Sequence, residues 1–108
     1  MSDQANVARG APISFMGLAV QDEHGEAIGS VSDVVYDEST QQPQWLVVKP
    51  GKLRAEHFVP ADGAFTTDEG NVVIAFTKQI VNHAPKAAGD HVITHDIDSE
   101  LRQYYASV

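Results

Sequence analysis

Cysteine is absent from this 108-residue chain, and basic residues are scarce. Without a thiol, the chain can form neither a disulfide framework nor a thiolate metal site. A reducing, cytoplasmic location is therefore the default expectation. Seven Lys and Arg residues against 15 Asp and Glu residues give a formal net charge of −8, which argues against general binding to nucleic-acid backbones or to anionic lipid.

Long apolar runs are also missing from the sequence. No run approaches the roughly 20 apolar residues that a membrane-spanning helix needs, and the first ten residues contain no apolar core of a signal peptide. We therefore expect no direct insertion into a membrane. Residues 1–12 are predicted to form a flexible leader and residues 13–108 one domain, because a chain of this length can bury one core without disulfides.

Short apolar segments separated by polar turns indicate a strand-rich domain. The predicted strands cover about residues 17–20, 27–37, 44–49, 53–60 and 72–76. After them, Thr77 is suited to cap a short helix over 78–82, and Asp96 or Asp98 to cap a terminal helix over 99–105. The sequence thus predicts an all-β fold: a small antiparallel β-barrel of five to six strands with a short C-terminal helix.

Three residues are assigned structural roles within these strands. Gly25 lies in a charged connection typical of a hairpin, and Gly29 fits a tight bend at a barrel corner. Asp33 interrupts an apolar segment whose alternation is uneven, which predicts a β-bulge nearby. We favour an Asp33 carboxylate that accepts backbone N–H groups over a catalytic acid, because no partner stands at a convincing spacing.

The order of these motifs resembles the PRC-barrel family, which is named after the cytoplasmic domain of the photosynthetic reaction centre H subunit. The matching motifs are Gly17-Leu18, Asp22-x-x-Gly25-Glu26-x-Ile28-Gly29, Asp33-Val34-Val35-x-Asp37, Pro43-x-Trp45-Leu46-Val47-Val48 and Phe58-Val59-Pro60. The tail of the chain looks like that of small stand-alone bacterial members. The resemblance implies a small barrel used as a docking or assembly surface, with no shared catalytic residues to carry over.

Two surfaces are candidates for binding. Lys49, Lys52 and Arg54 place three of the seven basic residues within six positions, which suits an anionic partner such as RNA. The alternative is an exposed hairpin whose charges blunt a sheet edge. Trp45, the single tryptophan, is expected to be partly buried and suited to anchor an interface.

Metal sites receive little support from the sequence. His91 and His95, followed by Asp96 and Asp98, have a spacing that zinc could use, but β-branched residues between the two histidines disfavour the helix that would align them. The acids around the turn at Asp22 do not match a calcium-binding loop. We therefore predict no metal and no cofactor.

The function predicted from the sequence is a non-enzymatic protein-binding or assembly module. We expect a homodimer, because the terminal helix has an apolar face that would need covering. The residues of that face are Ile97, Leu101, Tyr104 and Tyr105. One alternative is a ribosome- or RNA-associated factor acting through the basic hairpin. Another is an enzyme or small-ligand binder inside the barrel, although small barrels are usually filled by side chains.

Overall fold

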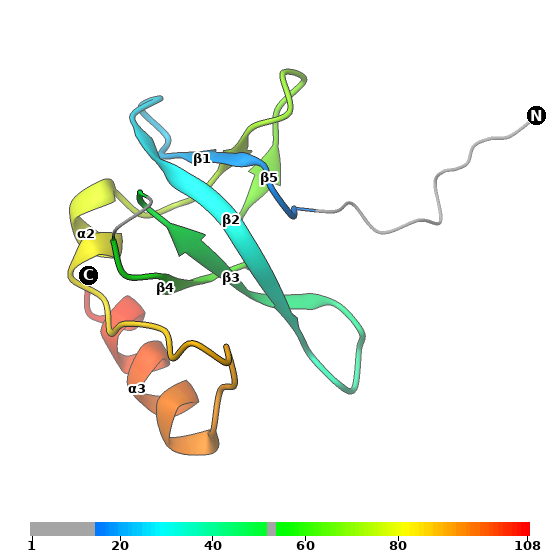
Figure 1. Cartoon of the computed structure of the whole chain (residues 1–108), viewed down its shortest axis with the longest axis vertical. Helices are drawn as coiled ribbons and strands as arrows, with labels where there is room; N and C mark the ends of the chain where they lie inside the picture. Colours follow the sequence, from blue (N-terminus) through cyan, green and yellow to red (C-terminus); the bar gives the residue numbers. More distant parts are fainter. Residues whose placement is uncertain (1–14, 52–53) are drawn as a thin grey trace, which may run out of the picture.

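The computed structural model describes residues 15–51 and 54–108 (Figure 1). The predicted leader and Lys52 therefore lie outside the described residues. The elements are β1 (Ala19–Gln21), β2 (Ala27–Tyr36), β3 (Pro43–Lys49), β4 (His57–Pro60), β5 (Phe65–Thr66), β6 (Val72–Val73), α2 (Lys78–Asn82) and α3 (His95–Ala106). No helix among these residues combines the length and the apolar character needed to span a membrane.

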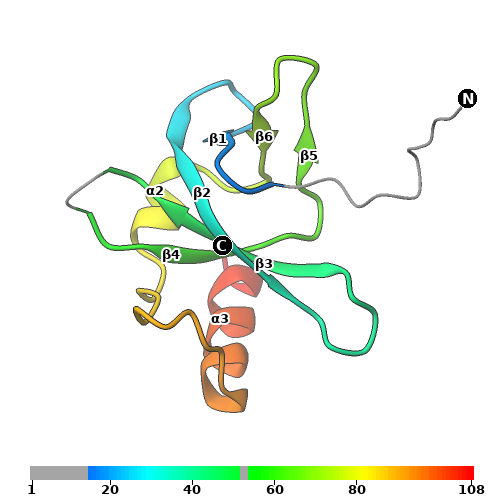
Figure 2. The same cartoon turned by 45° about the vertical axis from the view of Figure 1, so that its right-hand side comes forward.

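All six strands belong to one curved sheet in the order β4-β3-β2-β1-β6-β5. The predicted fold is wrong in two respects, because β1 and β6 pair in parallel and the end strands β4 and β5 are not hydrogen-bonded to each other within the described structure. Only four residues, 61–64, connect β4 at one edge of the sheet to β5 at the other (Figure 2). This connection does not reverse the direction of the chain, so β4 and β5 run the same way. The β5–β6 hairpin then sends β6 in the same direction as β1.

The long strand β2 bends over β3 with the help of a bulge and a glycine. The β2–β3 register shifts between Val31 and Asp33, where the uneven apolar alternation predicts a bulge. Gly29 lies so close to the end of β3 that a Cβ atom there would be 2.3 Å from the Lys49 carbonyl oxygen. Gly25 adopts a φ of +84° in the β1–β2 turn, a conformation that favours glycine.

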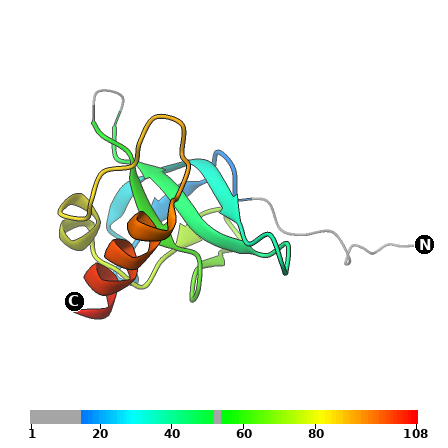
Figure 3. The same cartoon turned by 90° about the horizontal axis from the view of Figure 1, so that it is seen from below.

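The strand β3 is buried on both faces because the sheet lies between two apolar clusters. The inner cluster contains Leu46, Val48 and Val59, together with residues of β1, β2 and β6. The outer cluster contains Trp45, Val47 and Phe58 and is covered by α3, the red and orange helix in Figure 3. The alternation of side chains along β3 and β4 therefore supplies both cores.

Packing of α3 on this outer face corrects the expectation of an apolar helix face that needs a partner. Leu101 is fully buried and Tyr105 is only 7% exposed. The Tyr105 hydroxyl donates to the Phe58 carbonyl at 2.5 Å, and the Tyr104 hydroxyl donates to the Ile80 carbonyl. Burial raises the pKa of both tyrosines, so both remain neutral donors.

The helix α3 also begins earlier than predicted. Thr94, rather than an aspartate, is its N-cap, and its side-chain oxygen accepts from the Ile97 amide at 3.3 Å. Asp96 and Asp98 lie in the first turn instead, where negative charge favours the helix N-terminus. The short helix α2 has the predicted cap, Thr77, whose side chain accepts from the Ile80 amide.

Candidate functional site

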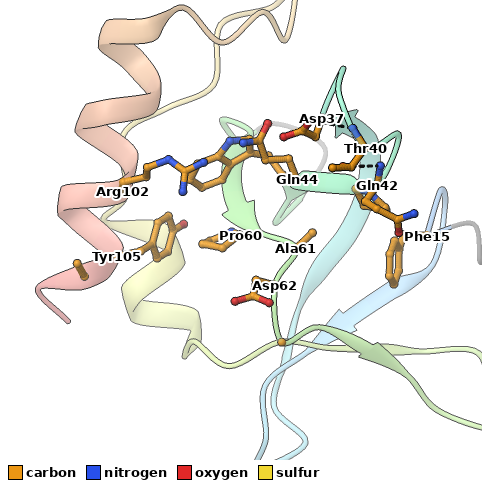
Figure 4. A pocket seen from close by; sticks show the side chains of 14 residues that line it. Phe15, Asp37, Thr40, Gln42, Gln44, Pro60, Ala61, Asp62, Arg102 and Tyr105 are labelled. Atoms are coloured by element: carbon orange, nitrogen blue, oxygen red, sulfur yellow. Dashed lines mark hydrogen bonds between the residues drawn. The ribbon is translucent and has the colours of Figure 1, made fainter.

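A surface groove separates α3 from the hairpin that joins β2 to β3. We call it the helix–hairpin groove; its volume is about 680 Å³. In Figure 4, Arg102 and Tyr105 approach from α3, Pro60 closes β4, Asp62 lies on the segment after that strand, and Phe15 stands at the far side. β4 ends at Pro60, opposite Trp45, and the start of β3, Pro43 and Gln44, lines the groove beside this pair.

Trp45 lines this groove from β3. The indole is 2% exposed, yet its Nε1–H has no hydrogen-bond partner among the described residues. The guanidinium of Arg102 lies over the indole ring, 5.8 Å from its centroid, within the range of a cation–π interaction. The Arg102 Nε donates to the carboxylate of Asp98, one turn earlier in α3, at 2.8 Å.

Acidic residues surround the groove on the side of the sheet. Asp37 accepts hydrogen bonds from the amides of Ser39 and Thr40, at 2.7 and 3.1 Å, and thereby shapes the β2–β3 hairpin. Asp62 lies on the segment after β4. With Asp98 beside Arg102, three carboxylates stand against one guanidinium, so the local charge is negative like that of the whole chain.

A second polar site joins residues that are distant in the sequence. His91 Nδ1 lies 2.8 Å from Asp33 Oδ2, and His91 Nε2 lies 2.8 Å from Glu56 Oε1. Both ring nitrogens face carboxylate oxygens, so both donate when the imidazole is protonated. We call Ser32, Asp33, Glu56 and His91 the acid–histidine cluster; it ties the segment before α3 to the sheet.

The electrostatics of this cluster favour its ionised form. Hydrogen bonds from His91 to Glu56 and to Asp33 raise the pKa of the histidine. The Ser32 hydroxyl, which donates to Glu56 at 2.5 Å, and then His91 lower the pKa of Glu56. His91 and the Val34 amide lower the pKa of Asp33. The Ser32 hydroxyl thus serves a carboxylate and not the histidine that would have to activate it as a nucleophile.

The stability that the acid–histidine cluster contributes is expected to fall as the pH rises above 6.5. Because the pKa of folded His91 is raised from 6.5, its contribution is complete below that value and is lost as the pH passes the folded pKa. The contribution of Glu56 to stability has the opposite pH dependence. It is present above pH 4.5 and is lost as the pH falls through the lowered pKa of folded Glu56. The cluster therefore contributes most between pH 4.5 and 6.5.

The test compares free energies of unfolding of the wild type and His91→Asn, measured with urea. His91 has a φ of +56°, a conformation that asparagine tolerates, so the substitution removes the ring without adding backbone strain. We expect a loss of about 1 kcal/mol below pH 6.5 that shrinks in alkaline buffer. Desolvation lowers the pKa of buried His57, so this residue also makes stability depend on pH. Its contribution is the same in both proteins and cancels in the difference between them. A difference that is constant with pH would contradict the assignment.

The basic hairpin is less cationic than its sequence suggests. The charge of Lys49 acts on Glu56 and helps to lower the pKa of that carboxylate, so part of its field is neutralised locally. Arg54 is exposed, and Lys52 lies outside the described residues. Binding of RNA at this hairpin stays a prediction.

The two histidines considered for zinc have separate environments. Both ring nitrogens of His91 are engaged by carboxylates, while His95 opens α3. The described residues contain no group of three or more His, Cys, Asp or Glu side chains arranged to hold a metal ion. Sequence reasoning missed the acid–histidine cluster and the partnership of Trp45 with Arg102, because neither has a local signal.

These observations define a class of protein: a small domain built on one curved, mixed β-sheet, with a helix packed on its outer face. A family model for the PRC-barrel domain matches residues 14–81, more than half of the chain, and the chain belongs to this family. No curated protein matches the chain. The matched region ends at Val81, so Arg102, Tyr105 and His91 lie beyond it.

Proposed function

We propose that this chain is a non-enzymatic protein-binding module whose partner occupies the helix–hairpin groove. The observation that carries the proposal is the unpartnered indole N–H of Trp45. A buried donor without an acceptor costs about 1–3 kcal/mol, and an acceptor supplied by a partner removes that cost. Membership of the PRC-barrel domain family supports a β-rich scaffold for such a surface.

The groove replaces the terminal helix face as the surface on which the proposal rests. Leu101 and Tyr105 are committed to the core of the same chain, whereas Ile97 and Tyr104 are half-buried. The homodimer stays a prediction, and light scattering at micromolar concentration tests it: a species of 11.7 kDa alone would contradict it.

The test of the proposed function is photo-crosslinking inside the native cell. A photoreactive residue is placed at Gln42, which lines the groove, and at the exposed Phe65 on β5, outside it, as the matched control. We expect defined protein conjugates from position 42 that are missing from position 65. Identical conjugates from both positions, or none from position 42, would argue against a partner in the groove.

Removal of the indole N–H gives a quantitative prediction for the captured partner. Trp45→Phe keeps an aromatic ring in the outer cluster but deletes the donor. We expect the affinity for the partner to fall about fivefold, which corresponds to one ordinary hydrogen bond. The measurement is a titration followed by calorimetry, with Tyr36→Phe as a control that changes an exposed aromatic residue outside the groove. Equal affinities of the wild type and Trp45→Phe would remove Trp45 from the binding site.

A further inference from the structure

We propose that the helix–hairpin groove binds an extended, basic peptide segment of a partner protein, with an Arg or Lys side chain of that segment taking the place of Arg102 over the Trp45 indole. The inference rests on the proposed function and adds the chemistry of the partner. Three features of the groove carry it: its charge, the arrangement of Arg102, and the missing acceptor at Trp45.

The charge of the groove favours a cationic occupant. Asp37 and Asp62 line it, and Asp98 pairs with Arg102 at its edge. The chain as a whole has a net charge of −8, which attracts basic partners during diffusion. The same carboxylates would repel an acidic segment, and a neutral segment would gain no charge attraction from them.

Arg102 shows how a cation is held in this groove. Its guanidinium lies over the indole of Trp45 while its Nε donates to Asp98. The side chain nevertheless remains 58% exposed. A long, exposed side chain exchanges easily between rotamers, so an incoming guanidinium or ammonium group can displace it and occupy the same aromatic face.

The backbone of the same segment supplies the acceptor that Trp45 lacks. The indole Nε1–H is buried and unpartnered, and displacement of Arg102 from the ring opens the indole to a ligand. A peptide carbonyl then accepts from Nε1, while the neighbouring basic side chain meets the carboxylates. A polypeptide offers both groups at adjacent positions, whereas a simple amine offers only the cation.

Because Arg102 and the ligand compete for the indole, one variant is expected to bind the peptide more tightly than the wild type does. Arg102→Ala removes the internal competitor and one positive charge, so the affinity for a basic peptide should rise, by about fivefold at low salt. Asp62→Asn should lower the affinity by a similar factor. Gln103→Ala, an exposed position next to Arg102 that does not line the groove, is the matched control and should change nothing.

The probe is a set of capped seven-residue alanine peptides with Arg, Gln or Glu at the centre, added to the full chain. Binding is followed through the emission of Trp45, the single tryptophan. The expected result is that the Arg peptide binds more tightly than the Gln peptide, that the Glu peptide binds most weakly, and that salt weakens the preference.

Several outcomes would overturn the inference. A preference for the Glu peptide would show that Arg102 pairs with an acidic ligand instead. A loss of Arg-peptide affinity in Arg102→Ala would show that Arg102 does not compete with the peptide for the indole. A dimer that forms in the absence of peptide, and that Arg102→Ala abolishes, would show that a second copy of the chain occupies the groove. If position 42 crosslinks a partner while the peptides show no charge preference, the proposed function survives and the basic-segment inference fails.

Discussion

Gly29→Ala is expected to destabilise the folded protein by at least about 3 kcal/mol, at the upper end of the cost of overpacking. The added Cβ would stand 2.3 Å from the Lys49 carbonyl oxygen and 2.8 Å from the Pro50 Cα. Both obstacles are backbone atoms, and Lys49 is held in register opposite Ser30. Relief of the clash would therefore require β2 and β3 to separate at the end of β3, where Ser30 pairs with Lys49.

Urea denaturation followed by circular dichroism measures this effect, with Gly89→Ala as the matched control. At Gly89 a new Cβ would meet nothing within 4 Å, and the backbone is not in the left-handed region. The control should remain within about 0.5 kcal/mol of the wild type, because it loses no contact and restricts the unfolded chain slightly. If Gly29→Ala behaved like Gly89→Ala, the close approach of β2 to the end of β3 would be wrong.

Local patterns in the sequence were sufficient for five of the six strands and for the family, whereas the two-residue strand β5 was not predicted. The β2 bulge and the short helix with its Thr77 cap were indicated by residues close together in the chain. Gly29 was also recognised as a special position, although its close neighbour Lys49 lies on the next strand. The alternation along β3 identified Trp45 and Val47 as one face. The PRC-barrel resemblance rests on the same local motifs, and the family match covers them.

Features that depend on distant residues were not predictable in this way. The direction of β6 follows from the short connection between β4 and β5, which has no signature of its own. His91 lies 58 residues from Asp33 and 35 residues from Glu56. Its positive φ is also invisible in the sequence, because β-branched neighbours indicate extended backbone.

The helix–hairpin groove illustrates the same limit. Its two walls come from the PRC-barrel match and from the residues after it, since Asp37 and Trp45 lie within 14–81 whereas Arg102 lies outside. Apolar residues at helical spacing correctly indicated an apolar face on the terminal helix. The pattern could not show that this face is covered by β3 and β4 of the same chain, because intramolecular and intermolecular burial have the same periodicity.

The burial of that face gives the second large expected effect, a loss of about 3 kcal/mol in Leu101→Ala. Leu101 is fully buried in the outer cluster, and truncation of a buried leucine costs about 2–5 kcal/mol, including the cavity. The loss should also loosen Tyr105, whose ring lies 6.4 Å from that of Trp45. Trp45 emission should therefore shift to longer wavelength before the main unfolding transition.

Denaturation monitored in parallel by Trp45 fluorescence and by far-ultraviolet circular dichroism separates the two effects. The control is Gln103→Ala, an exposed site on α3 that should stay within about 0.5 kcal/mol of the wild type. Equal stability of the Leu101 and Gln103 variants would contradict the packing of α3 on the sheet. Because α3 supplies one wall of the groove, Leu101→Ala should also weaken basic-peptide binding without touching the ligand. Retention of full affinity by the Leu101 variant would show that the groove does not need α3 in this position.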